Sequence, residues 1–329
     1  KNLDGSDYEF DARYLLRVAA KRLEEKNLEC FIRTECEFYL FQTDEDGLPT
    51  KIPHDNATYF DIAPKDKAEN VRREICLSLE QMGIAPETSH HQRGPGQNEI
   101  VYKYSSAVSS ADDFVTYKSV VKTIANKNGL YASFMPKPLN DFVGNQMIIE
   151  LFLYQDEENQ FSSHKMNPSA DAAHFAAGIL KYLRELSLFL FPSANSYQRL
   201  NHDETPKIIK VSDHTQGAAL RVDSSESDQS KLILRITDSC CNPYLVFGLL
   251  LNAGIAGIEQ QITLADDDQF FANNLSDAIH IAKSSDFVAS ILPHELLTLY
   301  LNKKETECSI IADAQDIEAI ETDLYFEQF

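Results

Sequence analysis

The hydrophobic residues of this chain follow two spacings in turn, one typical of helices and one typical of strands. Residues 11–25 place Leu15, Val18 and Leu23 on one stripe, which predicts an amphipathic helix. The same spacing predicts helices at about residues 66–82, 109–128 and 168–190, from 243 onward, and over most of the last part of the chain. Runs rich in β-branched and aromatic residues predict strands at about residues 31–41, 131–135, 145–154, 207–212, 218–223 and 231–237.

The order of these elements favours one fold class. The strands are spread between helices without a strict strand–helix–strand rhythm, and the sequence has no glycine-rich phosphate loop and no internal repeat. We therefore predict the α+β class, with a mainly antiparallel β-sheet flanked by helices. Of the 329 residues 43% are hydrophobic, so the chain can bury a sizeable core, and we expect residues 1–329 to form a single domain.

The charge of the chain limits its partners. A formal net charge of -21 would repel nucleic acids and anionic membrane surfaces, so we expect neither as a partner. The negative charge is partly concentrated at the end of the sequence, because no Lys or Arg follows Lys304. We predict an acidic, solvated helical tail over about residues 303–329.

The cysteines and the apolar runs indicate a compartment. The six cysteines are scattered without a CxxC pair, which predicts free thiols in a reducing environment. The longest apolar run, from Tyr244 to Ile258, is shorter than the roughly 20 residues that span a bilayer. No signal peptide opens the sequence, so we expect a cytoplasmic protein.

Candidate chemistry appears first on the predicted strand at residues 31–41. Glu35 and Glu37 are two residues apart, so both project from one strand face, about 7 Å apart along the strand. Magnesium and manganese prefer such carboxylate oxygens, although an ordinary hydrated strand face has the same pattern. The pattern alone leaves both possibilities open.

Two further segments carry unusual residues. The stretch SHHQRGPGQNEIVYKY contains His90 and His91, a Gly-Pro-Gly turn and then Glu99 on a strand-like run. The two histidines are either metal ligands or hydrogen-bonding loop residues. In the run KLILRIT, Ile233 shares a predicted polar strand face with Lys231 and Arg235, which is an odd position for an apolar side chain.

Five separated motifs, in this order, resemble the catalytic domain of the glutamine synthetase family. The resemblance covers about residues 8–300. The motifs are TECEFYLF at 34–41, HHQRGPGQNEI at 90–100, FMPKPL at 134–139, NSYQRL with ETP at 195–206, and RITDSCCNPYL at 235–245.

The resemblance implies an ATP-dependent ligase that joins glutamate to ammonia or to a larger amine. In this family ATP phosphorylates the γ-carboxylate of glutamate, and ammonia then displaces phosphate from the γ-glutamyl phosphate. Two divalent cations, Mg²⁺ or Mn²⁺, offset the charge of the phosphates. The family forms large rings, which implies a homo-oligomer. The resemblance also implies a smaller β-rich domain before the catalytic one. The sequence starts at the catalytic domain's first helix, so we expect this domain to be absent either from the protein or only from the sequence given.

Carrying the metal ligands over gives an uneven result. The cation nearer the glutamate corresponds to Glu37, Glu99 and Gln92, where the family has Glu in place of Gln92. The second cation corresponds to Glu35 and to two positions that are isoleucine here, Ile148 and Ile233. An isoleucine offers no lone pair, so the resemblance predicts an eroded second cation site.

The nucleotide side shows further departures. The resemblance assigns nucleotide contacts to His90, Tyr104 and Lys231, with Lys231 at a position where the family has arginine. It also predicts that Glu150 adds negative charge beside the phosphates. Two other family positions on this side, a serine and a loop arginine, fall on Phe152 and Gln216.

The glutamate side is better kept. Arg199 and Arg235 match arginines that contact the substrate carboxylate and the phosphate, and Arg221 matches a further substrate-binding arginine. Gly144 matches a glycine beside the substrate amino group. Glu204 matches a glutamate that shields the intermediate and takes a proton from ammonium. Each could instead serve only in a structural salt bridge or turn.

Three hypotheses follow from these matches. The first is an active ATP-dependent ligase, and the second is a non-catalytic glutamate-binding or scaffold subunit on the same fold. The third is a plain structural protein, which explains the lost ligands but not the retained arginines. We favour descent from a glutamate–ammonia ligase whose activity is weakened or lost.

Overall fold

A computed structural model describes residues 1–162, 168–200, 205–206, 208–212, 217–223, 229–264 and 269–329. Two residues discussed above lie outside the described ranges: Glu204, predicted to take a proton from ammonium, and Gln216, which stands where the family has an arginine.

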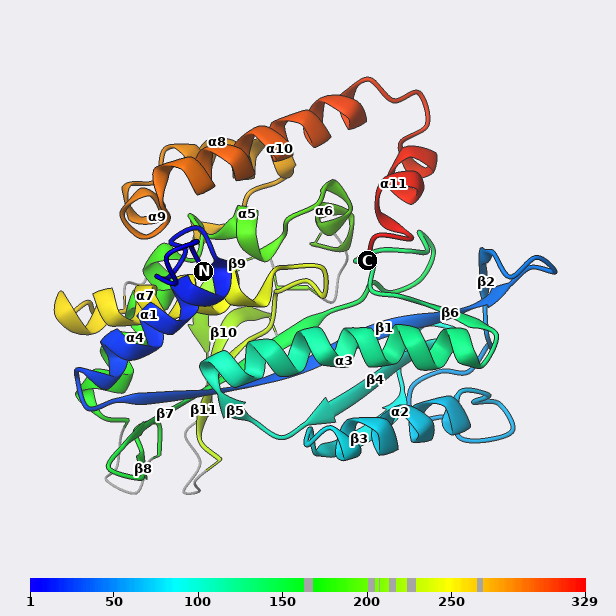
Figure 1. The fold of residues 1–329 in the computed structure, drawn as a ribbon, viewed down its shortest axis with the longest axis horizontal. Helices are drawn as coiled ribbons and strands as arrows, with labels where there is room; N and C mark the ends of the chain where they lie inside the picture. Colours follow the sequence, from blue (N-terminus) through cyan, green and yellow to red (C-terminus); the bar gives the residue numbers. More distant parts are fainter. Residues whose placement is uncertain (163–167, 201–204, 207, 213–216, 224–228, 265–268) are drawn as a thin grey trace.

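The centre of the molecule is one large β-sheet with helices packed on it (Figure 1). Its main path runs β12-β9-β10-β11-β7-β1-β4-β3, while β2, β5 and β6 pair with β1 and β8 pairs with β7. All of these pairings are antiparallel except the parallel pair β9–β10, so the predicted α+β class with a mainly antiparallel sheet is confirmed. The described strands are β1 Glu29–Thr43, β2 Pro49–Pro53, β3 Pro86–His91, β4 Gln97–Tyr102, β5 Ser105–Ser106, β6 Leu130–Ser133, β7 Met147–Gln155, β8 Glu158–Asn159, β9 Ile208–Ser212, β10 Ala218–Asp223, β11 Lys231–Leu234 and β12 Gln269–Phe270.

The helices agree with the predicted ones in most places. They are α1 Ala12–Glu24, α2 Glu69–Gln81, α3 Ala107–Lys127, α4 Ala170–Tyr182, α5 Ser187–Leu190, α6 Ala194–Leu200, α7 Pro243–Glu259, α8 Leu275–Lys283, α9 Asp286–Ile291, α10 His294–Ala312 and α11 Ile317–Tyr325. The continuous helix predicted over 168–190 is wrong, because the chain turns between α4 and α5. Leu186, Leu188 and Phe189 are all buried. After the turn, all residues of α5 are buried in the core.

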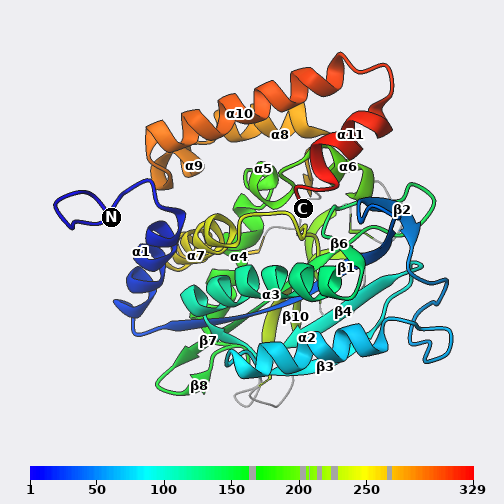
Figure 2. The same cartoon turned by 45° about the vertical axis from the view of Figure 1, so that its right-hand side comes forward.

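The two faces of β1 have different neighbours. Cys36 and Phe38 are fully buried on the face that α3 covers. Tyr117 of α3 donates its hydroxyl to the carbonyl oxygen of Cys36 at 3.0 Å, and its ring packs edge-on against Phe38. The alternating residues of β1, which include Glu35 and Glu37, therefore project from the opposite face. Figures 1 and 2 show α3 lying along β1 in both views.

A helical layer packs at one end of the sheet. The almost wholly apolar α7 is buried against α1 and α4. The contact with α4 requires glycine, because a Cβ on Gly178 would lie 2.2 Å from the carbonyl oxygen of Ala253. This close approach fixes α7, and with it the chain that leads out of β11.

The C-terminal segment is helical, as predicted, but it is not solvated throughout, because α11 packs onto the domain. Tyr325 and Phe326 are buried, and Phe326 packs against Phe41 of β1. The carboxylate of Glu321 is also buried and accepts a hydrogen bond from Asn195 Nδ2 at 2.8 Å. Most of the other acidic side chains of this segment are exposed. Helix α11 packs against α6.

Two global features complete the fold. Within the described residues, no helix combines the length and the apolar character needed to cross a membrane. The cysteines are free thiols, as their scattered positions predicted.

Candidate functional site

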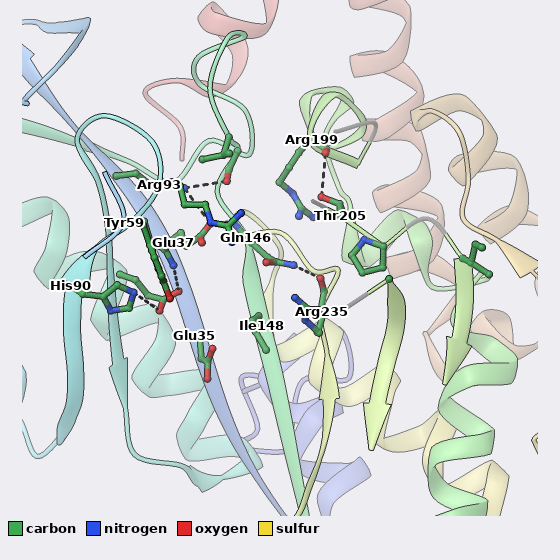
Figure 3. A pocket seen from close by; sticks show the side chains of 18 residues that line it. Glu35, Glu37, Tyr59, His90, Arg93, Gln146, Ile148, Arg199, Thr205 and Arg235 are labelled. Atoms are coloured by element: carbon green, nitrogen blue, oxygen red, sulfur yellow. Dashed lines mark hydrogen bonds and ion pairs between the residues drawn. The ribbon is translucent and has the colours of Figure 1, made fainter. Parts of the chain in front are cut away.

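A cavity of about 720 Å³ opens on the sheet face opposite α3 (Figure 3). Its walls come from neighbouring strands and from the segments that follow β3, β6 and α6. The lining residues are Glu35, Glu37, Tyr59, His90, Gln92, Arg93, Gln97, Glu99, Val143, Gly144, Gln146, Ile148, Arg199, Thr205, Pro206, Ile208, Gly217 and Arg235. The structure thus brings together most of the predicted site residues from segments far apart in the sequence.

Two carboxylates face each other at one end of this cavity. Glu37 of β1 and Glu99 of β4 are directly opposite in the antiparallel register. The Glu37 carboxylate accepts hydrogen bonds from the Gln146 backbone N–H at 2.7 Å and from Gln97 Nε2 at 3.2 Å. The Glu99 carboxylate accepts one from Gln92 Nε2 at 3.2 Å. We call Glu37, Glu99, Gln92 and His90 the inner end of the cavity.

His90 completes the inner end with an unused nitrogen. Its Nε2 is buried without a hydrogen-bond partner and lies 3.5 Å from a Glu99 oxygen. Phe60 stacks on the imidazole at a centroid distance of 4.5 Å. Burial, followed by the charges of Arg72 and His91, lowers the pKa of His90. A buried imidazole nitrogen without a hydrogen-bond partner, beside a carboxylate, suits a divalent cation.

His91 faces away from the cavity and has a structural partner. Its side chain is fully buried, with Nε2 2.9 Å from Asp55 Oδ1 and Nδ1 2.6 Å from the Gln92 carbonyl oxygen. Burial alone would lower the pKa of His91, but the hydrogen bond and charge of Asp55 outweigh it and raise that pKa. Burial would raise the pKa of Asp55, but the hydrogen bonds from His91 and the Lys67 N–H outweigh it and lower that pKa to about 2. The pair anchors the loop from behind.

The Gly-Pro-Gly turn is required by the space around it. A Cβ on Gly94 would lie 1.9 Å from the Tyr39 hydroxyl oxygen. Gly96 has a φ of 69°, and a Cβ there would lie 2.6 Å from the Leu40 carbonyl oxygen. The turn therefore packs tightly against β1 and brings the side chain of Gln97 to Glu37.

The opposite end of the cavity has a different composition. Glu35 of β1 is paired with Val101 on one side and with Ile148 of β7 on the other. Burial raises the pKa of Glu35 to about 7, and the carboxylates of Glu150 and Glu99 add to this shift. We call Glu35, Ile148 and the next cross-strand row, Arg33, Glu150 and Ile233, the outer end.

The two isoleucines of the outer end lie in different places. Ile148 lines the cavity directly across from Glu35 (Figure 3). Ile233 pairs with Glu150 on the same sheet face but is only 7% exposed and does not line the cavity. The sequence correctly placed both on the polar face of the sheet, while only Ile148 faces the open space.

The Glu150 carboxylate is paired with two cations, which the resemblance did not predict. It accepts a hydrogen bond from Arg33 Nε at 2.5 Å and pairs with Lys231 Nζ at 2.9 Å. The neighbouring strands β1, β7 and β11 bring these three charges together. Lys231, predicted to contact a nucleotide, is therefore engaged by Glu150 and does not line the cavity.

Two arginines reach the cavity from the side opposite Glu37. Arg199 of α6 is 2% exposed, donates Nε to Asp238 at 2.5 Å and donates a second bond to the Ile236 carbonyl oxygen. Gly144 is needed beside it, because a Cβ there would lie 2.7 Å from Arg199 Cγ. Arg235 also lines the cavity, and burial followed by the charge of Arg221 lowers its pKa.

Other predicted residues lie outside the cavity. Arg221 on β10 pairs with Asp223 at 3.8 Å, and Tyr104 packs in an aromatic cluster with Phe31 and Phe152. Neither lines the cavity. Their substrate and nucleotide contacts remain predictions.

No role was predicted for Arg33 or Gln97, although Gln97 lines the cavity and Arg33 lies 3.6 Å from Glu35. Arg33 lies two residues before Glu35 on the same strand, so the alternation of β1 already predicts that the two share a face. Its partner Glu150 is 117 residues away, and that pairing required the register of β1 and β7. Gln97 occupies the strand start beside Glu99, and only the turn geometry directs its amide toward Glu37.

The two ends differ in their fitness for a metal ion. Within the described parts of the chain, no three His, Cys, Asp or Glu side chains lie close enough together to hold a metal. At the inner end, two carboxylates, an amide and the unpartnered His90 nitrogen supply oxygen and nitrogen donors of the kinds that a divalent cation prefers, but their present spacing does not form such a group. At the outer end, Glu35 is paired across the sheet with the side chain of Ile148, which offers no donor.

Comparisons with known proteins agree with this geometry. A family model described as the catalytic domain of glutamine synthetase matches residues 9–325. A glutamine synthetase of Methanosarcina mazei is 36% identical, over 92% of this chain and 72% of its own length. Among solved structures, a novel glutamine synthase homolog superposes with a TM-score of 0.88 at 26% identity, over 98% of this chain and 77% of its own. A structure of GmaS in complex with ADP superposes with a TM-score of 0.84 at 25% identity, over 98% and 79%. The chain therefore belongs to the glutamine synthetase family and carries its catalytic domain.

Proposed function

We propose that this chain is an ATP-dependent ligase of the glutamate–ammonia type whose reaction is weakened at the outer end of its cavity. The proposed reaction transfers the γ-phosphoryl group of ATP to the γ-carboxylate of glutamate and releases ADP. Ammonia, or an amine, then displaces phosphate from the γ-glutamyl phosphate. The observation that carries the proposal is Ile148, which lines the cavity opposite Glu35 at a position where the family supplies a metal ligand.

The glutamate side supports binding of the amino acid. Arg199 and Arg235 line the cavity on the side opposite the inner carboxylates, so an anion between them would be neutralised from two directions. Arg199 is held rigidly by Asp238, and little entropy is lost when it engages a carboxylate. Gly144 leaves room beside Arg199 for the substrate.

The inner end would hold one Mg²⁺ or Mn²⁺ through Glu37, Glu99, Gln92 and His90. A cation bound there would offset charge on the phosphates and on the substrate carboxylate. The chain's own residues do the positioning: Gln97 and the Gln146 N–H orient Glu37, while Asp55 and His91 fix the loop that carries Gln92.

Nucleotide binding and proton transfer complete the proposed chemistry. A structural relative, GmaS, was solved with ADP, which supports a nucleotide as co-substrate. Glu204, outside the described residues, is proposed to take a proton from ammonium and to shield the intermediate. We also propose a homo-oligomer, on the basis of the family alone.

The weakening is expected to be large. Removing one preorganised group that stabilises transition-state charge typically costs about 100- to 1,000-fold in rate. The outer end lacks ligand side chains at both Ile148 and Ile233, and Gln92 contributes no charge at the inner end. We therefore expect turnover at least about 100-fold below that of a chain with these ligands restored.

Phosphate release that depends on both ATP and glutamate tests the proposal. The unaltered chain is compared with the triple variant Gln92→Glu, Ile148→His, Ile233→Glu, with Mg²⁺ or Mn²⁺ present. Slow release that rises in the triple variant supports weakened ligase activity. Fast release by the unaltered chain, unchanged in the variant, would instead establish a fully active ligase.

A second candidate is a non-catalytic glutamate-binding subunit. It is favoured by the same observation, since the arginines of the glutamate side are kept while the outer end has lost its donors. Calorimetric titration separates the two: binding of glutamate together with ATP fits a ligase, whereas glutamate binding without ATP binding or phosphate release fits the subunit. Replacing ammonia with methylamine in the release assay tests whether an amine is the preferred acceptor.

A further inference from the structure

The outer end contains a buried ion cluster that the family resemblance did not predict. The cluster consists of Arg33 on β1, Glu150 on β7 and Lys231 on β11, which are neighbouring strands. Both oxygens of Glu150 are occupied, one by Arg33 Nε at 2.5 Å and the other by Lys231 Nζ at 2.9 Å. The three side chains are 15%, 4% and 12% exposed, so the cluster is shielded from solvent.

Arg33 also reaches two further carboxylates. Its guanidinium lies 2.7 Å from a Glu87 oxygen and 3.6 Å from a Glu35 oxygen. Glu35 is the one carboxylate among the three side chains predicted to hold the second cation. The positive charge that Glu35 would otherwise take from a metal is therefore already present as part of the protein.

Lys231 is held in the same cluster by a second contact. Its ammonium group lies 5.6 Å from the centroid of the Phe152 ring, at a distance typical of a cation–π interaction. With Phe152 on one side and Glu150 on the other, the ammonium is fixed near the sheet. The two cations thus face three carboxylates, Glu150, Glu35 and Glu87.

A second divalent cation does not fit this arrangement. The side chains opposite Glu35 and Glu150 are Ile148 and Ile233, which have no donor atoms. The oxygens of Glu150 are already used by Arg33 and Lys231. A metal ion at Glu35 would also lie within a few ångströms of the Arg33 guanidinium, and like charges at that separation repel strongly in a partly buried site.

We propose that Arg33 and Lys231 are the built-in countercharge of the outer end, and that the chain therefore takes one divalent cation, at the inner end only. The proposal deepens the proposed function, since it names the cation requirement of the same site.

Counting bound Mn²⁺ tests the proposal without any turnover. Purified full chain is equilibrated with Mn²⁺ and ADP, free Mn²⁺ is measured by electron paramagnetic resonance, and the bound ions per chain are calculated. We expect about one ion per chain, and about two would overturn the proposal. Glu37→Gln should remove the bound ion; if Glu35→Gln removes it instead, the ion lies at the wrong end and the proposal is also overturned.

The countercharge role is tested by Arg33→Met, which keeps the stem and removes the charge. We expect the freed carboxylates of Glu35 and Glu150 to take up a second, weaker Mn²⁺, whereas Arg33→Lys and the exposed control Arg13→Met should stay at the count of the unaltered chain. An unchanged count in folded Arg33→Met would overturn this role. Lys231→Met provides the same test if Arg33→Met fails to fold. The result is independent of ligase turnover, so a chain without phosphate release can still confirm or contradict the cation count.

Discussion

The two ends of the cavity each contain a glutamate of β1, but the side chains around the two glutamates differ. Each end has a glutamate of β1 facing the same side of the sheet, Glu37 at the inner end and Glu35 at the outer end. Across from Glu37 the neighbouring strand supplies Glu99, which adds negative charge. Across from Glu35, β4 supplies Val101 and β7 supplies Ile148, and the Arg33 guanidinium lies 3.6 Å from the Glu35 carboxylate.

Under the proposed function, one strand would keep a cation site and lack another two residues away. At the inner end, carboxylates face an unpartnered His90 nitrogen, so an external cation has something to bind. At the outer end the carboxylates face arginine and lysine, so the protein supplies the cations itself. The predictions below separate these two arrangements, beginning with the largest expected effect.

The largest effect should follow from Asp55→Ala, which removes the support behind the inner end. The change leaves His91 buried without its partner and frees the backbone N–H groups of Ala57, Lys67 and Gly96. Breaking a buried pair by removing one member typically costs about 3–5 kcal/mol of unfolding free energy. Urea unfolding of the variant measures this loss.

Asp61→Ala is the matched control in the same loop. Asp61 accepts a bond from the Thr58 N–H and pairs with the exposed Lys65 at 3.5 Å. An exposed pair of this kind contributes about 0–1 kcal/mol. Equal losses in the two variants would contradict a structural role for the Asp55–His91 pair.

The next largest effect should be on Mn²⁺ affinity in Glu37→Gln. Changing groups that only orient a metal ligand already costs 10- to 100-fold in affinity, so we expect a loss of at least about 100-fold when a carboxylate ligand itself is neutralised. Glu35→Gln should weaken binding by less than about tenfold, because its carboxylate is balanced by Arg33. Isothermal titration calorimetry compares the two, and equal losses would mean that the ends do not differ.

Gln92→Glu should sharpen the comparison in the opposite direction. The amide of Gln92 contacts Glu99, and a carboxylate at this position would add a charged oxygen ligand for the cation. We expect Mn²⁺ to bind about tenfold more tightly, which is about 1.4 kcal/mol. The same titration measures this gain, and weaker binding would indicate that repulsion among the acids exceeds the gain in ligand charge.

The smallest effect should be the pH dependence of stability from His91. Its pKa is raised in the folded state, so its contribution is complete below the ordinary pKa of about 6.5 and is lost as pH rises through the raised value. Asp55 acts in the other direction: its pKa of about 2 makes its contribution complete above about 3.8 and lost as pH falls toward 2.

Unfolding by urea between pH 5 and 9 measures this dependence. The difference in unfolding free energy between the unaltered chain and His91→Asn should be largest near pH 5–6 and should shrink at higher pH. A difference that stays constant with pH would show that folding does not raise the pKa of His91.

Sequence periodicity predicted the elements that build the sheet well, because each depends on local spacing. The strand at 31–41 and the helices at 11–25 and 66–82 lie within a few residues of β1, α1 and α2. The predicted continuous helix over 168–190 was wrong because residues 186–190 are all buried, and no local pattern specifies a turn at Leu183–Leu186. The acidic tail was misjudged for a related reason, since Tyr325 and Phe326 are buried by contacts with distant residues.

The candidate site was predictable where one strand sufficed and unpredictable where several strands had to be combined. The alternation of β1 places Glu35 and Glu37 together, and the motifs identify Glu99, Arg199 and Arg235 as neighbours of the cavity. The neutralisation of Glu150 by Arg33 depends on the register between β1 and β7, which no single segment encodes. The ion pairs of the outer end therefore join residues that are far apart in the sequence.

The position of bound manganese gives the most direct test of the difference between the two ends. Crystals of the full chain grown with Mn²⁺ and ADP would be measured for anomalous scattering from manganese. We predict one strong anomalous peak between Glu37, Glu99 and His90, and none beside Glu35 and Ile148. A second peak of comparable height next to Glu35, with Arg33 moved away from it, would contradict the proposal that the protein supplies its own cations at the outer end.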